Sequence, residues 1–335
     1  MNRDLEVYRE LRNWLPPNVF DCHVHVSLAR HCGQISPERM KKNWAMEVAS
    51  EMSWDDLWTH YERLFPDQRL RVIAFGNVYR EVDLDSNNEY ILSGVRNSDG
   101  RAYGLFAVAP QWAANKTAEA FAQGFVGIKP YPDLAGKDDD EISIFEFVPH
   151  EHLSVVNEHA GVLMLHLPRK GRLADPENIR ELLEIRERYP AIRIVVAHIG
   201  RAFTMPTVEK GLPHFADVPG LFFDIAANLN ADVMEYALGI VGPDRLLFGS
   251  DLPITLMRGM REHIGETYIN YTDGPYSWNV NRKSPEEEAR YTYFLYEELL
   301  ALKAAIERAG LKHDAVHKIM YENTAGLIDA VRTSS

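Results

Sequence analysis

Short apolar runs alternate along the chain with amphipathic helical patterns, and this alternation predicts the fold class. Eight runs are rich in β-prone residues, and most are continuously apolar, as is typical of parallel strands buried on both faces. The predicted strands cover residues 19–24, 71–75, 103–109, 125–129, 162–166, 192–198, 221–225 and 245–249.

Helix signals separate these strands. Asp175-Pro176 offers a capping oxygen followed by a proline at the first helical position. Asn230 is predicted to cap the helix before the eighth strand, and Asp85 and Thr117 are predicted to cap two others. Eight strand-then-helix units predict an α/β fold, a (β/α)₈ TIM barrel.

The chain is longer than a plain barrel, which needs about 250 residues, because it has 335. Most of the excess falls in residues 27–69, after the first strand, and 252–284, after the eighth. Segments that follow barrel strands lie on the face where active sites are built, so we expect two long loops that cap this face. Residues 285–335 are predicted to add helices. No linker divides the sequence, which predicts a single domain over residues 1–335.

The composition limits which classes of binding partner the protein is expected to have. The net charge is −13, which disfavours binding to nucleic acid or to an anionic membrane. Two cysteines are too few for a disulfide framework. No apolar run approaches membrane-spanning length, and no signal peptide is evident, so we expect a cytoplasmic protein. The sequence is compatible with both a monomer and a homo-oligomer.

The first predicted strand carries the first candidate for chemistry. Alternate side chains of a strand share a face, so Asp21, His23 and His25 are expected to point the same way. Two imidazoles on one face can reach a single divalent metal. The structural alternative is that two of thirteen histidines lie near each other by chance.

Four other predicted strands also end in residues that can bind a metal. Each of these residues alone has a structural explanation. Lys129 could be a solvent-exposed residue at a strand end, His166 could be a hydrogen-bonded histidine at the edge of the core, and Asp251 could be a helix cap. Together with His198 and the two histidines of the first strand, they converge on one rim of the predicted barrel. This convergence favours a metal centre.

These motifs resemble the amidohydrolase superfamily. The residues that carry the resemblance are His23, His25, His166, His198 and Gly249-Ser250-Asp251-Leu252-Pro253. Phe248–Pro253 and Tyr321–Ala325 resemble its amidohydrolase-related branch of TIM-barrel metal-dependent hydrolases, and the likeness runs from residue 20 to about 328.

The resemblance implies one or two divalent ions, with zinc as the expected metal. It implies that His23, His25, His166 and Asp251 bind the metal. It also implies that His198 polarises the substrate or the attacking water, or binds a second metal.

The branch contains hydrolases of lactones and related acid derivatives, and also non-oxidative decarboxylases. Lys129 lies where binuclear superfamily members carry a carboxylated lysine that bridges two metals, which favours hydrolysis. An uncarboxylated Lys129 would instead bind a substrate carboxylate.

We therefore expect a metal-dependent hydrolase of a small, anionic substrate, such as a lactone, amide or ester of a carboxylic acid. Asp251 and His198 are the expected catalytic residues, with Asp251 moving the proton. Arg201, Arg169 and Tyr131 are expected to bind the substrate, although each arginine could instead form a surface salt bridge. The alternatives are a metal-dependent decarboxylase and a non-catalytic barrel, and the intact ligand set disfavours the latter.

Overall fold

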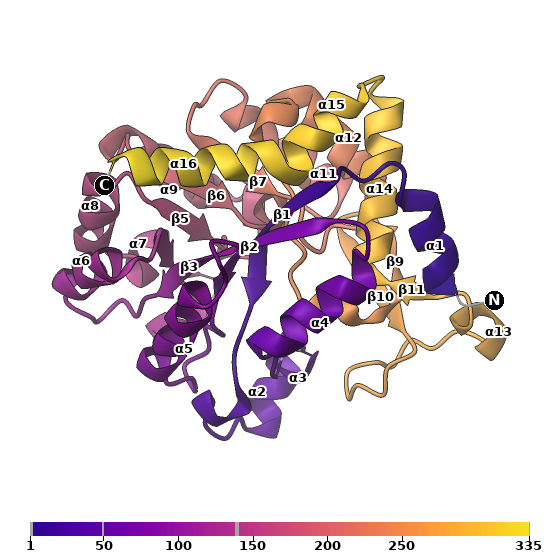
Figure 1. Ribbon diagram of the computed structural model, residues 1–335, viewed down its shortest axis with the longest axis horizontal. Helices are drawn as coiled ribbons and strands as arrows, with labels where there is room; N and C mark the ends of the chain where they lie inside the picture. The colour runs from indigo at the N-terminus through magenta and orange to yellow at the C-terminus, as the bar shows by residue number, and fades with distance from the viewer. Residues whose placement is uncertain (1–2, 49, 138–140, 335) are drawn as a thin grey trace.

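The structure, a computed structural model, describes residues 3–48, 50–137 and 141–334. Eight parallel strands stand in sequence order around a barrel (Figure 1), which confirms the predicted (β/α)₈ fold. Hydrogen bonds from the first strand to the segment after the last, including Cys22 N to Phe248 O at 2.9 Å, bring the two ends of the sheet together. The strands are β1 (Asn18–His25), β2 (Arg69–Phe75), β3 (Ala102–Ala107), β4 (Gly127–Lys129), β5 (Val162–Leu165), β6 (Arg193–Val196), β7 (Leu221–Asp224) and β8 (Leu246–Leu247).

Helices surround the strands. They are α1 (Arg3–Leu11), α2 (Pro37–Lys42), α3 (Ala45–Val48), α4 (Trp54–Leu64), α5 (Leu84–Arg96), α6 (Ala114–Gln123), α7 (Ile144–Phe147), α8 (His150–Glu158), α9 (Pro176–Arg188), α10 (His198–Arg201), α11 (Met205–Gly211), α12 (Ala231–Val241), α13 (Pro285–Glu288), α14 (Phe294–Arg308), α15 (His313–His317) and α16 (Asn323–Ser334). None of the described helices is long and apolar enough to cross a membrane.

Two of the four predicted helix caps are confirmed. Asp175 caps α9 and Asn230 caps α12, each by accepting a backbone hydrogen bond from the first turn. The other two predictions are wrong. Asp83, two residues before Asp85, accepts from Ser86 N and caps α5. Thr117 lies inside α6, where its buried hydroxyl bonds to the ring of a histidine on α8.

A register shift in β1 changes which side chains face the barrel interior. The pairing of β1 with β2 slips between Asp21 and Val24. As a result, Asp21 does not share a face with His23: it points out of the barrel and accepts a 2.7 Å hydrogen bond from Tyr61 of α4. The expectation of simple alternation along this strand was therefore wrong. A bulge re-aims side chains in this way, and bulges are common beside active sites.

The barrel interior is filled by side chains from the strands and from one helix. Phe20, Tyr103 and Val162 pack there with Leu327 and Val331 of α16. Because these strand residues lie near the amino ends of their strands, α16 closes this end of the barrel (yellow in Figure 1). A second apolar layer joins the outer faces of the strands to the surrounding helices.

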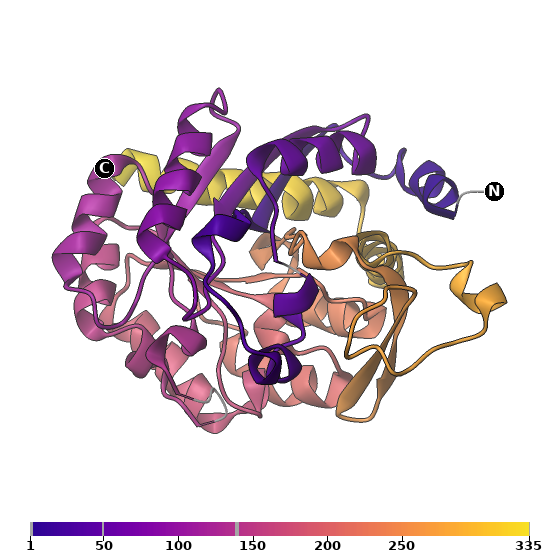
Figure 2. The same cartoon turned by 90° about the horizontal axis from the view of Figure 1, so that it is seen from below.

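Both predicted insertions lie at the opposite, carboxyl end of the strands. Helices α2 and α3 form the part of the insertion after β1 that lies at this end, whereas α4 packs along the outside of β1, where Tyr61 bonds to Asp21. The segment after β8 is not an extended loop, because it folds into an antiparallel hairpin of β9 (Arg258–Ile264) and β10 (Thr267–Thr272), with β11 (Thr292–Tyr293) beside β9. Figure 2 shows the hairpin (orange) on the same side of the molecule as α2 and α3 (indigo). The two insertions therefore cap this end, as predicted.

Candidate metal centre

A pocket of about 820 Å³, including its mouth, opens at the carboxyl ends of the strands. Its size falls in the usual range for small-molecule sites. Eight of the nine residues predicted for the site line this pocket: His23, His25, Lys129, Tyr131, His166, His198, Arg201 and Asp251. Arg169 is not among the lining residues. It forms an ion pair with Asp175 at 3.0 Å and donates to Glu141 O at 3.0 Å.

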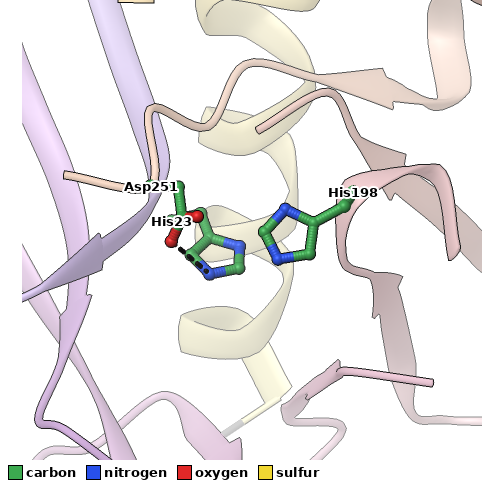
Figure 3. Close-up of side chains that lie close together, drawn as sticks. All are labelled: His23, His198 and Asp251. Atoms are coloured by element: carbon green, nitrogen blue, oxygen red, sulfur yellow. Dashed lines mark ion pairs between the residues drawn. The ribbon is translucent and has the colours of Figure 1, made fainter. Parts of the chain in front are cut away.

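His23, His198 and Asp251 form a compact group of possible metal ligands (Figure 3). All three are buried, and one donor atom from each lies within 4.8 Å of the others. His25 and His166 line the same pocket outside this compact group. The compact group thus includes His198, which the resemblance assigns to the substrate, the water or a second metal.

Distances around Asp251 fit a shared ion. Its Oδ1 lies 3.6 Å from His23 Nε2 and 3.4 Å from His25 Nε2. Both separations are long for a hydrogen bond, whereas two ligands about 2.1 Å from one tetrahedral ion lie roughly 3.4 Å apart. The arrangement therefore suits a divalent metal between these atoms better than direct pairing.

The Nδ1 atom of each of the two buried histidines in the compact group has a hydrogen-bond partner. His23 Nδ1 contacts Asp224 Oδ2 at 2.9 Å, and His198 Nδ1 contacts Ala226 O at 2.8 Å. A metal-binding histidine typically donates its second ring N–H to a carboxylate or a carbonyl, which fixes the ring and leaves Nε2 for the metal. Both rings are oriented in this way.

Asp224, at the end of β7, was missed in the sequence. It lies in the apolar run Leu221–Asp224, and its carboxylate also accepts a 2.7 Å hydrogen bond from His198 N. An acidic residue in a buried strand costs free energy unless it is paired. The presence of Asp224 in an otherwise apolar run was therefore the signal in the sequence for a buried residue with a specific partner.

Several site residues have left-handed backbone conformations. His198, Ile199 and Arg201 have φ values of 57°, 50° and 62°, and Asp251 has 55°. For residues other than glycine this conformation costs on the order of 1–2 kcal/mol each, and it is found where packing or function holds it. The backbone thus carries strain at the residues expected to do the chemistry.

Burial sets the protonation states in the pocket. It lowers the pKa of His23, His25 and His166, so these rings are neutral and can bind a metal. Burial alone would raise the pKa of Asp251, but its contact with His25, followed by the nearness of His198 and His23, outweighs this and leaves the pKa of Asp251 below its usual value. Burial lowers the pKa of Lys129 to about 8.

Two buried nitrogen atoms in the pocket have no hydrogen-bond partner within the described part of the chain. They are His25 Nδ1 and Lys129 Nζ. Polar atoms that remain unpaired when buried cost free energy, and metal or substrate ligands commonly satisfy them. Together with the donor set, they show that these residues fit a divalent metal.

The pocket wall adds residues that the sequence analysis did not assign. Arg261 and Tyr268 come from the β9–β10 hairpin, Phe203 follows α10, and Trp44 comes from the insertion after β1. Arg261 could not be found from the sequence because its segment was predicted as a loop, without the strand pairing that turns it toward the pocket.

A family model described as amidohydrolase matches residues 20–329. Among curated protein sequences no match was found.

Several solved structures share the fold. A probable 2-pyrone-4,6-dicarboxylic acid hydrolase from Acinetobacter baumannii, with citric acid bound, is 17% identical, with a TM-score of 0.56 over 93% of this chain and 99% of that one. A 2,6-dihydroxybenzoate decarboxylase in complex with 2,6-dihydroxybenzoate is 12% identical, with a TM-score of 0.58 over 94% and 100%. A dihydroxybenzoic acid decarboxylase from Polaromonas sp. JS666, with manganese and 2-nitroresorcinol, is 15% identical, with a TM-score of 0.55 over 94% and 97%.

Proposed function

The chain belongs to the amidohydrolase family of divalent-metal enzymes, and from this premise we propose that it hydrolyses a small, anionic substrate, such as a lactone, amide or ester of a carboxylic acid. The observation that carries the proposal is the buried group of histidines around the ionised Asp251, in a pocket that also contains Lys129, whose Nζ has no hydrogen-bond partner among the described residues.

Asp251 and its four neighbouring histidines would hold one or two ions. These histidines are His23, His25, His166 and His198. We propose zinc, because imidazole and carboxylate ligands with an open position suit it. When bound, such an ion supplies positive charge that polarises a substrate oxygen and acidifies a nearby water.

The protein's own groups would move the proton and stabilise charge. Asp251 is ionised, so it can accept the proton of the attacking water and pass it to the leaving group. Asp224 and Ala226 hold His198 rigidly, so its ring, when Nε2 also carries a proton, can stabilise negative charge that develops on the substrate oxygen.

Lys129 supports hydrolysis in a second way. With a pKa of about 8, roughly a tenth of its amine is neutral at pH 7 and able to add to CO₂. We propose that Lys129 is carboxylated and would then help to hold two ions. An unmodified amine would instead pair with a substrate carboxylate.

Charge in the pocket supports an anionic substrate. The chain carries a net charge of −13, yet two arginines, Arg201 and Arg261, line this pocket. Arginine recognises carboxylates through paired hydrogen bonds. Two of the similar structures hold citric acid and 2,6-dihydroxybenzoate, which are carboxylates. Tyr131 lies on the same wall and is proposed to contact the substrate.

Decarboxylation of a small carboxylic acid is the second candidate. It is favoured by the likeness to two dihydroxybenzoate decarboxylases and by the unmodified Lys129 as an alternative anchor for a carboxylate. Measuring CO₂ release across a panel of lactones, esters and aromatic acids separates the two reactions, because hydrolysis of these compounds releases an acid and no CO₂.

Replacement of Asp251 by asparagine tests the proposed mechanism. Asn keeps the size and one ligand oxygen but cannot act as a base, so we expect Asp251→Asn to retain the fold and part of the metal while kcat falls by roughly 10²–10⁴. Turnover and metal content are measured together on the substrate found in the panel.

The structural alternative predicts another result. If Asp251 were only a helix cap, asparagine would cap about as well and activity would survive. Turnover near that of the wild type at full metal occupancy would remove Asp251 from the chemistry.

A further inference from the structure

Arg261 projects from the inserted hairpin into the pocket and is held there by fixed contacts. It lies on β9 opposite Asn270 of β10. Its Nε donates to Asn270 Oδ1 at 2.8 Å, and its Nη1 donates to Ala227 O at 2.7 Å. These two bonds orient the guanidinium and leave its Nη2 amino group without a hydrogen-bond partner among the described residues.

Aromatic rings flank this guanidinium. Its central carbon lies 4.4 Å from the ring centre of Tyr268 and 5.0 Å from that of Phe203. The two rings pack edge to face, 5.2 Å apart. Such contacts hold an arginine in one orientation at little cost, because its planar charged group is weakly hydrated. Tyr268 and Phe203 also line the pocket, so they offer flat apolar surface beside the charge.

The positive charge of Arg261 is not neutralised within the described part of the protein, where no carboxylate lies within ion-pair distance of it. The two acids that act on it from farther away are Glu298 and Asp251. Glu298 accepts from Ala227 N, and burial raises the pKa of its carboxyl well above the usual value. Asp251 faces the histidines. A second arginine, Arg172, adds positive charge nearby.

A partly buried cation without a counterion is costly, and a bound anion removes that cost. We propose that Arg261 is a specificity-determining residue that binds a carboxylate on a planar ring of the substrate, a group other than the one that reacts at the histidine–aspartate floor. This inference rests on the proposed function. It refines the substrate class to ring compounds with a carboxylate remote from the reacting group.

Arg172 provides a matched control. Its guanidinium lies over the same two rings, 5.7 Å from Phe203 and 5.8 Å from Tyr268, but it is not among the residues that line the pocket. A variant of Arg172 removes a stacked arginine of the same kind without removing charge from the pocket wall.

The test is calorimetric binding of isophthalate, a ring with two carboxylates, and benzoate, which has one, to the zinc-loaded protein. We expect wild type to bind isophthalate at least tenfold more tightly than benzoate. Arg261→Gln should weaken isophthalate binding roughly 10–100-fold, to the level of benzoate. Arg261→Lys should lose part of the preference for isophthalate, because lysine keeps the charge but cannot donate two parallel hydrogen bonds to a carboxylate. The affinity of Arg172→Gln for isophthalate should stay within about threefold of wild type.

Other outcomes overturn the inference. An equal loss of isophthalate affinity in the Arg261 and Arg172 variants would mean that arginine packing against Phe203 and Tyr268 determines binding, and not the charge that faces the pocket. A wild type that binds neither ligand, or binds both equally, would exclude the proposed substrate class. Circular dichroism of the Gln and Lys variants checks the fold. Because binding is read without turnover, failure here is distinguishable from failure of the Asp251→Asn test.

Discussion

Asp224 links the two buried histidines of the compact group. One of its oxygens contacts the ring of His23, and the other accepts from the backbone of His198. Both oxygens are thus engaged by residues that would hold the metal, and the carboxylate is fully buried. Asp224 is therefore a positioning residue for the candidate centre.

Replacing Asp224 by asparagine should weaken metal binding. An amide can present an N–H to the ring of His23 where the carboxylate presents an acceptor, so we expect zinc affinity to fall by roughly 10–100-fold. Competition with a chromophoric chelator measures it. Asp21→Asn is the matched control, because the buried Asp21 bonds to Tyr61 and to backbone N–H groups but to no metal-site ring. A similar affinity in both variants would contradict the assigned role.

At this scale the sequence identified the candidate metal ligands in the pocket. His23, His25, His166, His198 and Asp251 could be found because each follows or ends a recognisable strand. Asp224 and Arg261 could not be found in that way. The partners of Asp224 are 26 and 201 residues away, and the orientation of Arg261 depends on a hairpin pairing that local periodicity does not reveal.

At the scale of the element, the turn His198–Arg201 positions two site residues by its unusual backbone. Four consecutive residues, including Gly200 at φ 64°, are left-handed. The turn packs against Leu173, and a Cβ built on Gly200 would lie 2.7 Å from Leu173 Cδ1. Glycine is needed at this position for both its conformation and its size.

Gly200→Ala should therefore destabilise the protein. Left-handed strain and the contact with Leu173 together should lower the free energy of unfolding by about 2–4 kcal/mol. Urea denaturation at fixed metal content measures the change. Gly239→Ala is the control with the opposite sign: Gly239 lies in α12 with open space around it, so alanine should stabilise by about 0.5–1 kcal/mol. Equal effects would contradict this account of the turn.

The elements themselves differ in how far the sequence predicts them. The eight buried strands were recognisable because short, continuous apolar runs between turn residues are typical of strands buried on both faces. The β1 bulge and the β9–β10 hairpin were not recognisable. A bulge depends on pairing with the neighbouring strand, and β9 (Arg258–Ile264) is only partly buried along most of its length and mixes charged with apolar residues, so neither has a clear periodic pattern.

At the scale of the whole molecule, the two insertions meet over the pocket. The rings of Trp44 and Trp278 lie 5.3 Å apart, and Ser277 donates its N–H and its hydroxyl to Glu47 at 2.9 and 2.7 Å. Segments more than 200 residues apart in the chain thus form a common cover. Such a cover limits access to the site.

Trp278→Ala should loosen this cover. We expect EDTA to remove zinc roughly tenfold faster, with little change in equilibrium affinity, because the variant alters access and none of the ligands. Stopped-flow chelation measures the rate. Trp58→Ala is the control, since Trp58 packs against Arg101 and lines none of the metal pocket. Unchanged kinetics in the Trp278 variant would show that the contact does not control access.

The closure of the barrel by α16 has a consequence for the order in which the molecule can be made. Its side chains Leu327 and Val331 complete an interior that Phe20 begins, and synthesis proceeds from the amino end. The inner face of β1 therefore emerges from the ribosome about 300 residues before its last packing partner. The barrel cannot reach its final packing strand by strand during translation, and its interior is complete only once the chain has been extended through α16.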